Sequence, residues 1–353
     1  MKKNLTSWWT GENLLMYRCE PTDIEILKSL DNHNYGNRIF TSYEWVTFLK
    51  VNQNAKPVVL EIYDQQRLLG YFVGLVKKYL GFAILGSPFD GWFTPDMGFI
   101  WLQDHDIQKA LEAVSQYAFK KLKCWYVQIK DKAITFSDLS PDTHYTVAKT
   151  LYLDLRQTEE EIRSKFSKSA NNNTLNKLFK RGGYIKEVPL SLEVADQFYD
   201  QLVDVFAKQK LKPNYSRQKI HDMVASLQKK PEYVYALQVF SENHICVATS
   251  IYLKLNDWCY SIAFASYTAY QNLSPNEAHY WHGIKHLKEE GFTTLDLCGV
   301  RDWKLKFGPQ MAEIPIILFY RNRALPHLKQ GAENIVLAWR KIKGWISTTS
   351  KRK

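Results

Sequence analysis

The sequence predicts an α/β protein made of two similar units in tandem. The chain has 353 residues, enough for two domains that each bury a core of their own. Apolar residues make up 45% of the chain and aromatic residues 14%, as in a folded globular protein rather than a disordered one. One order of strands and helices also occurs twice, at a spacing of roughly 175 residues.

The first unit is predicted from the kinds of residue in each segment. Runs rich in Val, Ile, Tyr and Phe, bounded by Asp, Asn or Gly, predict strands. In chain order we expect a helix over 41–51, strands over 57–63, 68–76 and 82–85, a helix over 107–121 and a strand over 125–129.

The second unit repeats this order after an additional strand and helices. We expect a strand over 151–155, a helix from Thr158 past Phe166, helices from Glu193 and over 217–229, strands over 233–240, 246–253 and 258–264, a helix over 276–290 and a strand over 293–297. Pro275 suits the first turn of a helix and Gly291 suits its end. We therefore divide the chain into 1–149, 150–322 and a C-terminal helix with a basic tail over 323–353.

Composition also limits the partners and the location. The net charge of +11 favours anionic partners, among them CoA, nucleotide-linked sugars, tRNA and anionic lipid or polysaccharide. The five cysteines contain no C-x-x-C pair and no metal-ligand spacing, so we expect free thiols and no metal. The N-terminus lacks the apolar core of a signal peptide, and no apolar run reaches the ~18 residues that span a bilayer. These features predict a cytoplasmic protein.

The segment 293–308 is the first candidate site. A short β-rich run ends at Asp296, a turn follows at Gly299, and basic side chains come next. Acidic residues at strand ends beside basic loops are common at functional sites, which favours a functional role for this segment. The alternative is a turn whose charged side chains only face solvent. The charged residues here are Asp296, Arg301, Asp302, Lys304 and Lys306.

A helix, Gly291, a strand ending in Asp296 and the sequence Lys304-Leu-Lys-Phe-Gly308 resemble the GNAT-like acyltransferases of the Fem and cellulose-biosynthesis-protein (CelD-like) type. The start of the helix over 41–51, Thr41-Ser-Tyr-Glu-Trp45, resembles a Ser-x-x-Trp helix start in the same proteins. The resemblance implies two tandem GNAT-like domains, each a mixed, mostly antiparallel sheet flanked by helices. It also implies that a lysine before Phe-Gly lies at the cleft for acceptor and donor, which maps onto Lys306.

The loop 86–98 is the second candidate site. Its prolines and glycines predict a shaped loop that carries acids and aromatic rings, and it resembles the first-domain loop that borders the acceptor pocket in the Fem type. We assign Asp90 as catalytic and Ser87, Trp92 and Asp96 as substrate-binding. The alternative is a rigid connector with buried aromatic residues.

The donor site has a weaker signal. The usual CoA-pyrophosphate loop is absent, and Leu273-Ser-Pro-Asn276 takes its place, so we assign Ser274 and Asn276 to binding of an acyl-CoA co-substrate. Tyr215 and Tyr267 would border the cleft of the second domain, with ordinary packing as the alternative.

Three further features allow more than one interpretation. The basic segment 165–182 is a phosphate-binding or a solvated helix. His279, His282 and His286 share a helix face, and apart from Glu277 no Cys or acid has a spacing that suits zinc, so a surface or core role, or one proton acceptor, is the alternative to a metal site. The apolar stripe in 323–353 fits docking on the domain or peripheral contact with a membrane surface.

We therefore expect an N-acyltransferase without a permanently bound cofactor. An acyl group would pass from an activated donor, acyl-CoA, to an amine on a sugar or cell-envelope or polysaccharide precursor that is small, lipid-linked or nucleotide-linked. Asp90 or Asp296 would orient or deprotonate the amine and Lys306 would stabilise charge. The first alternative is an aminoacyl-tRNA-dependent enzyme that builds peptidoglycan bridges, although no sustained heptad predicts the long coiled-coil arm of some of these enzymes. The second is a non-catalytic GNAT-fold binding module.

Overall fold

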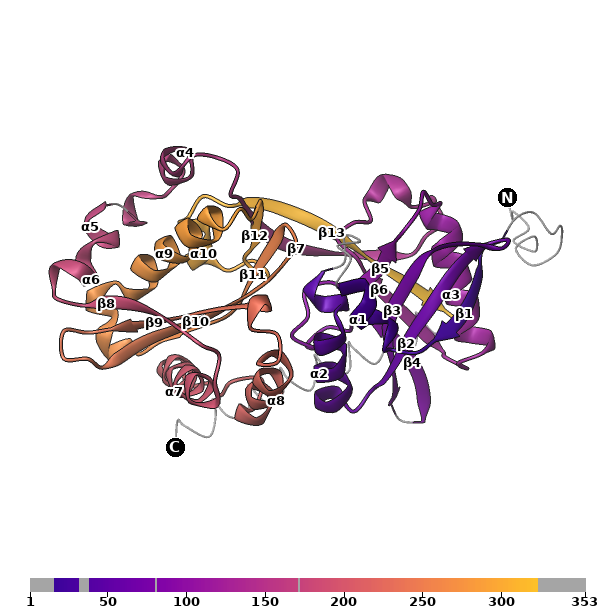
Figure 1. Cartoon of the computed structure of the whole chain (residues 1–353), viewed down its shortest axis with the longest axis horizontal. Coiled ribbons are helices and arrows are strands. Elements are labelled where there is room, and N and C mark those ends of the chain that lie inside the picture. Colours follow the sequence, from indigo (N-terminus) through magenta and orange to yellow (C-terminus); the bar gives the residue numbers. More distant parts are fainter. Residues whose placement is uncertain (1–15, 32–37, 80, 171, 323–353) are drawn as a thin grey trace, which may run out of the picture.

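The computed structural model describes residues 16–31, 38–79, 81–170 and 172–322 (Figure 1). We call β1 through η2 the first unit and β7 through α10 the second unit; they lie side by side along the long axis of the molecule. The described strands form one 13-stranded sheet in the order β1-β2-β3-β4-β6-β13-β7-β12-β11-β10-β9-β8, with β5 paired to β3.

The first unit has mostly antiparallel strands and three helices. Its elements are β1 (Arg18–Thr22), α1 (Ile26–Asp31), η1 (Ile39–Thr41), α2 (Tyr43–Gln53), β2 (Lys56–Asp64), β3 (Arg67–Tyr79), β4 (Phe82–Ser87), β5 (Gly98–Trp101), α3 (Ile107–Lys120), β6 (Tyr126–Lys130) and η2 (Phe136–Asp138).

The second unit follows the expected order and contains one further strand, β8, that was not predicted. Its elements are β7 (Tyr145–Asp154), α4 (Glu159–Ser164), η3 (Lys168–Ala170), α5 (Asn172–Leu175), α6 (Lys177–Lys180), β8 (Tyr184–Val188), α7 (Leu192–Lys208), α8 (Arg217–Leu227), η4 (Pro231–Tyr233), β9 (Val234–Phe240), β10 (Cys246–Leu255), β11 (Trp258–Ser266), η5 (Thr268–Leu273), α9 (Pro275–Glu289), β12 (Thr294–Asp296) and α10 (Asp302–Leu305).

The last described strand, β13 (Gln310–Tyr320), joins the two units. It leaves the second unit and lies between β7 and β6, with Met311 opposite Leu151 and Leu318 opposite Gln128 (Figure 1). One strand therefore hydrogen-bonds to both units. Our division at 149/150 falls inside β7 and stays a proposal.

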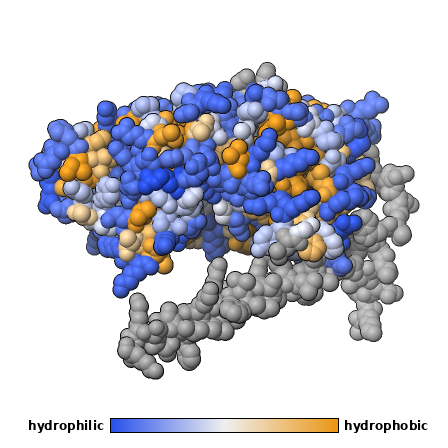
Figure 2. All heavy atoms as spheres, turned by 90° about the horizontal axis from the view of Figure 1, so that it is seen from below, coloured by the Kyte–Doolittle hydropathy of each residue, from blue (hydrophilic) through white to orange (hydrophobic). Residues whose placement is uncertain are grey.

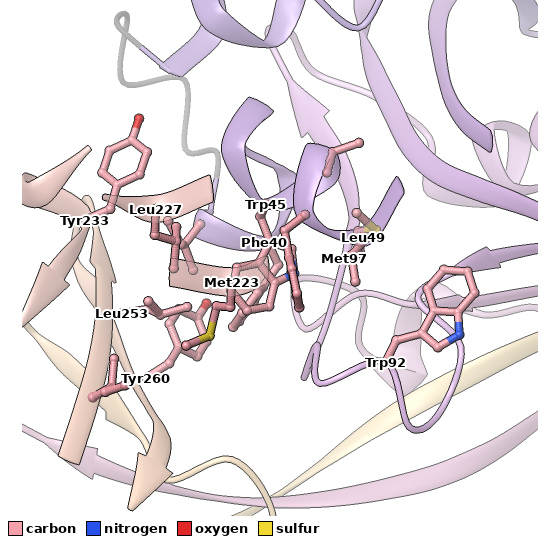
Figure 3. Packing of buried hydrophobic residues seen from close by; sticks show 14 of the residues in the cluster. Phe40, Trp45, Leu49, Trp92, Met97, Met223, Leu227, Tyr233, Leu253 and Tyr260 are labelled. Carbon is pink, nitrogen blue, oxygen red and sulfur yellow. The ribbon is translucent and has the colours of Figure 1, made fainter. Parts of the chain in front are cut away.

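The two units also share a hydrophobic core. Helix α2 of the first unit packs against α8 of the second, and Trp45 and Met223 are both fully buried in the cluster between them (Figure 3). The rings of Phe40 and Tyr260 meet edge to face across the units at 4.5 Å between centroids. Apolar burial on this scale fixes the units relative to one another.

The predicted mixed α/β fold is confirmed, with local differences. The helix expected from Thr158 past Phe166 ends at Ser164, and the basic segment 165–182 is broken into η3, α5 and α6 instead of forming one helix. The predicted C-terminal helix over 323–353 lies outside the described residues.

The surface agrees with the charged composition. The face shown in Figure 2 is largely hydrophilic, with small hydrophobic patches on both units. No helix among the described residues is both long enough and apolar enough to cross a bilayer.

We predict that Trp45→Ala destabilises the protein by about 3–5 kcal/mol, because it empties part of the core between the units. The change also removes the hydrogen bond from Trp45 Nε1 to Thr94 Oγ1, which is 3.0 Å long. Urea unfolding would measure the loss. Val51→Ala on the same helix is the matched control, because Val51 is 64% exposed, and it should change stability by less than about 0.5 kcal/mol. Equal effects of the two changes would contradict the shared core.

Candidate active site between the two units

The central strands β11 and β12 run parallel and separate from one another. They pair only at Trp258–Thr294, Cys259–Leu295 and Tyr260–Asp296. Beyond that point β11 continues to Ser266, whereas β12 ends and the chain turns away. Strands that separate leave backbone groups of β11 free for a ligand. We call this place the strand opening.

Asp296 lies at the origin of the strand opening and is 1% exposed. Its Oδ1 accepts hydrogen bonds from Thr150 Oγ1 at 2.6 Å and from the Cys298 backbone N–H at 2.7 Å. Its Oδ2 is buried without a hydrogen-bond partner. Burial raises the pKa of Asp296 to about 6; the nearby carboxylate of Asp96 adds to the shift, and the two hydrogen bonds and Lys132 oppose it.

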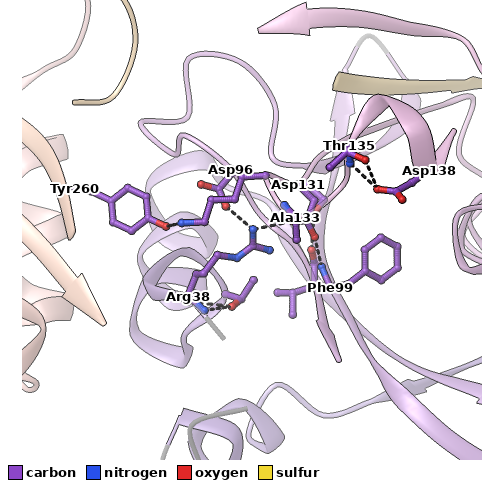
Figure 4. Close-up of polar contacts among 12 residues, drawn as sticks. Arg38, Asp96, Phe99, Asp131, Ala133, Thr135, Asp138 and Tyr260 are labelled. Carbon is purple, nitrogen blue, oxygen red and sulfur yellow. Dashed lines mark hydrogen bonds and ion pairs between the residues drawn. The ribbon is translucent and has the colours of Figure 1, made fainter. Parts of the chain in front are cut away.

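Lys132 reaches the same place from the first unit, on the turn that follows β6. Its Nζ donates a hydrogen bond to the hydroxyl of Tyr260 (Figure 4). The same Nζ lies 3.0 Å from the centroid of the Trp258 ring. Burial lowers the pKa of Lys132 to about 7, and the charge of Arg38 adds to the shift, whereas Asp96, Asp296 and Asp131 oppose it. Lys132 and Asp296 therefore both titrate near neutral pH, in one electrostatic cluster.

Arg38 holds this part of the first unit together. Its Nη1 lies 2.9 Å from Asp96 Oδ1 and 2.7 Å from Asp131 Oδ1 (Figure 4). Asp131 also accepts backbone N–H bonds from Phe99 and Ala133, each 2.9 Å long. Because Asp131 immediately precedes Lys132, these contacts of Asp131 hold the turn that carries the lysine in place.

A second group of side chains lines the start of α9. Lys306, at the end of α10, forms an ion pair with Glu277. His279 is 1% exposed and donates its Nδ1–H to the carbonyl oxygen of Pro275 at 2.8 Å, which leaves Nε2 as a buried acceptor without a partner. Burial lowers the pKa of His279 to about 4, so the ring is neutral. Asn276 Oδ1 is likewise buried without a partner.

The structure brings together only part of the predicted site. Asp96 and Asp296 belong to one electrostatic cluster, and Lys306 and Asn276 lie near the start of α9. Ser274 is the N-cap of α9 in a left-handed conformation with φ of 54°, and its side chain makes no capping bond. Asp90 is exposed on the loop after β4 and belongs to neither group.

Several predicted binding residues have structural roles. Lys304 is 8% exposed, and its Nζ donates to the carbonyl oxygens of residues 297–299, so it closes the turn after β12. Ser87 Oγ donates to the Val73 carbonyl oxygen at 2.6 Å. Trp92 packs in the shared core.

The remaining three predicted residues lie elsewhere. The ring of Tyr215 packs against the ring of Phe93 in the first unit, with 5.3 Å between the two centroids. Tyr267 follows β11 and donates its backbone N–H to the Val247 carbonyl oxygen at 2.9 Å. Arg301 is exposed at the start of α10.

Sequence reasoning did not select Lys132, Arg38 or Tyr260. One signal was available for Lys132, because Asp131 and Lys132 directly follow the strand β6, as Asp296 ends β12. Nothing local distinguishes Arg38 or Tyr260, whose partners are distant in the sequence. As for metals, no group of three or more His, Cys, Asp or Glu side chains suited to a metal occurs in the described part of the chain, and His286 instead lies 3.1 Å from Glu187.

Comparisons with known proteins agree with this architecture. A family model described as an acetyltransferase (GNAT) domain matches residues 167–305. The crystal structure of FemX superposes with a TM-score of 0.66 at 12% identity and covers 88% of this chain and 99% of that chain. L-PGS from Bacillus licheniformis gives a TM-score of 0.53 at 13% identity, covering 87% of this chain and 94% of its own.

A conserved protein of unknown function from Bacteroides thetaiotaomicron gives a TM-score of 0.51 at 8% identity, over 86% of this chain and 100% of its own. No curated protein matches the sequence. The fold is thus a Fem-like tandem GNAT fold, and the second unit carries a GNAT acetyltransferase domain. The predicted fold and the acyltransferase class are confirmed.

We predict that Asp296→Asn stabilises the protein above pH 6. The folded protein binds the proton of Asp296 more tightly than the unfolded chain does. The free energy of unfolding therefore falls as pH rises from about 4 to about 6, and above pH 6 the whole of this loss is present. The amide keeps an acceptor oxygen for Thr150 and removes the charge. Urea unfolding between pH 4 and 8 should show a gain on the order of 2 kcal/mol that appears across this window.

Asp104→Asn, at an exposed position in the segment before α3, is the control and should leave the wild-type stability curve unchanged. Parallel stability curves for Asp296→Asn and the wild type would contradict the raised pKa.

Proposed function

We propose that this protein is an N-acyltransferase that moves an acyl group from acyl-CoA to an amine on a sugar or cell-envelope precursor. The observation that carries the proposal is the position of Asp296, a buried carboxylate with a free Oδ2 at the point where β11 and β12 of a GNAT domain separate. An unpartnered buried oxygen costs about 1–3 kcal/mol, and a substrate N–H would satisfy it.

The donor would lie along the strand opening. The part of β11 beyond Tyr260 offers backbone groups that β12 does not use. Asn276 Oδ1 and His279 Nε2 are buried acceptors near the start of α9, and they suit the amide N–H groups of the pantetheine arm of CoA. Lys306 would stabilise negative charge on the donor carbonyl or phosphate once it exchanges Glu277 for the ligand.

The acceptor would enter between the units, where Asp296 holds its nitrogen. Transfer then needs no metal and no covalent enzyme intermediate: the amine nitrogen attacks the thioester carbonyl carbon, the C–S bond breaks and CoA leaves as the thiol. The required parts are a grip on both substrates, a proton acceptor and stabilisation of the oxyanion.

A second candidate function uses aminoacyl-tRNA as the donor. The similarity to FemX and the net charge of +11 favour it, since a basic surface attracts nucleic acid. The acceptor would again be an envelope precursor, and the reaction would take place in the cytoplasm or at the inner face of the membrane.

Calorimetric titration with acetyl-CoA, and in parallel with aminoacyl-tRNA at two salt concentrations, separates the two donors. Saturable binding of acetyl-CoA supports the first proposal. Binding of aminoacyl-tRNA that weakens with salt, without binding of acetyl-CoA, moves the assignment to the second. Binding of neither donor overturns both.

We predict that Asp296→Asn lowers kcat by about 100-fold or more, because an amide group without the negative charge cannot hold the ammonium group of the acceptor. Release of CoA from acetyl-CoA, with glucosamine as the amine probe, would measure the effect. The Kd of acetyl-CoA should change by less than about threefold, because Asp296 lies at the acceptor end of the opening. Asp104→Asn should keep the wild-type rate. An unchanged kcat in Asp296→Asn would remove Asp296 from the mechanism.

A further inference from the structure

The strand opening belongs to the second unit, but a basic side chain of the first unit meets it. Lys132 extends from the turn after β6 and ends against the ring and hydroxyl of Tyr260, the residue of β11 paired with Asp296 (Figure 4). Tyr260 and Asp296 are directly opposed on parallel strands, so their side chains lie on the same face of the sheet. Lys132 is therefore directed at the face on which the carboxyl group of Asp296 lies.

The charges around Lys132 do not balance. Arg38 comes from the segment before η1, Asp96 from the loop before β5, Asp131 from the same turn and Asp296 from β12. With Lys132 in its neutral form, one guanidinium group meets three carboxylates in this buried space. The aromatic groups on the remaining sides belong to β7 and β11: Tyr152, Trp258 and Tyr260. A protonated amine is therefore attracted to the cluster, because its charge offsets part of the excess negative charge.

Position and charge together suggest a role for the lysine. Asp296 has one free oxygen, which can accept one hydrogen bond from an incoming ammonium group. Ammonium has to lose a proton before its nitrogen can attack a carbonyl carbon. A neutral lysine has a lone pair for that proton, and Lys132 is held close enough to Asp296 to influence its titration.

We propose that Lys132 is a catalytic residue that accepts the proton of the acceptor amine while Asp296 Oδ2 holds the same nitrogen. The proposal rests on the proposed acyl transfer and adds to it that the acceptor binds as a cation and that the site is complete only when both units contribute. Burial, which lowers the pKa of Lys132 to about 7, agrees with this role, because the neutral form is then present at neutral pH.

The proton balance closes without another reactant. Neutral Lys132 takes a proton from the substrate ammonium, and the freed nitrogen forms the C–N bond with the thioester carbonyl carbon. The tetrahedral intermediate breaks its C–S bond, and the thiolate of CoA leaves. The second proton of the former amine passes to solvent, and the proton on Lys132 goes to the thiolate, which leaves Lys132 neutral for the next turnover.

Two substitutions test the lysine. Lys132→Arg keeps a positive charge but stays protonated, and Lys132→Met keeps an unbranched chain over the Trp258 ring without any basic group. Each should lower kcat with acetyl-CoA and glucosamine about 100-fold while the Kd of acetyl-CoA stays within about threefold. The rise of wild-type kcat toward a plateau near pH 7 should disappear from both pH profiles.

Lys254→Met is the matched control. Lys254 is also largely buried: its Nζ lies 2.7 Å from Glu290 Oε2 and 5.7 Å from the Phe292 ring centroid. It is opposite Cys259 on β11, so its side chain lies on the face of the sheet opposite to that of Tyr260 and Asp296. This variant should keep the wild-type kcat and pH profile. Kinetics of Lys132→Arg and Lys132→Met within threefold of the wild type would overturn the proposal.

A direct titration separates this proposal from the proposed function. The ¹³Cε resonance of Lys132, assigned by its loss in Lys132→Met, should titrate near pH 7. A midpoint above pH 9 would overturn the proposal, whether or not glucosamine is a substrate, because Lys132 would then be charged at neutral pH. If the wild type transfers no acyl group but the Lys132 resonance has its midpoint near pH 7, the result counts against the proposed reaction. The assignment of Lys132 as a group that is neutral at pH 7 would then still hold.

Discussion

The arrangement of the candidate site depends on one buried guanidinium group. Arg38 Nη1 lies within ion-pair distance of both Asp96 and Asp131, and all three side chains are almost completely shielded from solvent. Removing one partner from such a network leaves an uncompensated charge in a medium that solvates charge poorly, so its members hold one another in place. The network fixes both the loop before β5 and the turn after β6. Lys132, on that turn, is consequently presented to the second unit in one position.

The site combines groups that each work against folding. Asp296 has a buried oxygen without a partner, and Lys132 is a lysine with most of its side chain out of water. Desolvation is the largest cause of both pKa shifts. Each shift therefore means that the charged side chain is less stable in the folded protein than in the solvated unfolded chain, which lowers the free energy of unfolding. The core shared by α2 and α8 and the long pairing of β13 offset this cost. The contact between the units therefore both stabilises the fold and positions the reactive groups.

The sequence predicted the fold well because local patterns determine its elements. The runs of Val, Ile, Tyr and Phe, the proline in the first turn of α9 and Gly291 after it all lie within or next to the elements that they define. The break in 165–182 escaped prediction because its basic residues suit either one helix or several short turns. The return of β13 to β6 also escaped prediction, because a buried strand carries no mark of which strand it will pair with.

The candidate site was predicted only in part, because some of its contacts join residues that are distant in the sequence. Asp296 was accessible to sequence reasoning because it is the last residue of a strand, and Asp96 because it lies on an unusual loop. Lys304 has the same sequence context as Lys306, yet its ammonium group is used by three backbone carbonyl oxygens, a contact that only the folded turn creates. Lys132 and Tyr260 become neighbours through the packing of two units and are 128 positions apart.

The return of β13 also constrains the order in which the chain can acquire its structure during synthesis. The strand β6 pairs with β4 on one side and with β13 on the other, and all of the second unit is translated between β6 and β13. On the ribosome the first unit therefore exposes an unpaired strand edge until the last part of the chain emerges. Premature release would leave that edge open to pairing with other chains, and a shortened product that retains every residue of the strand opening would still lack the strand that joins its two units.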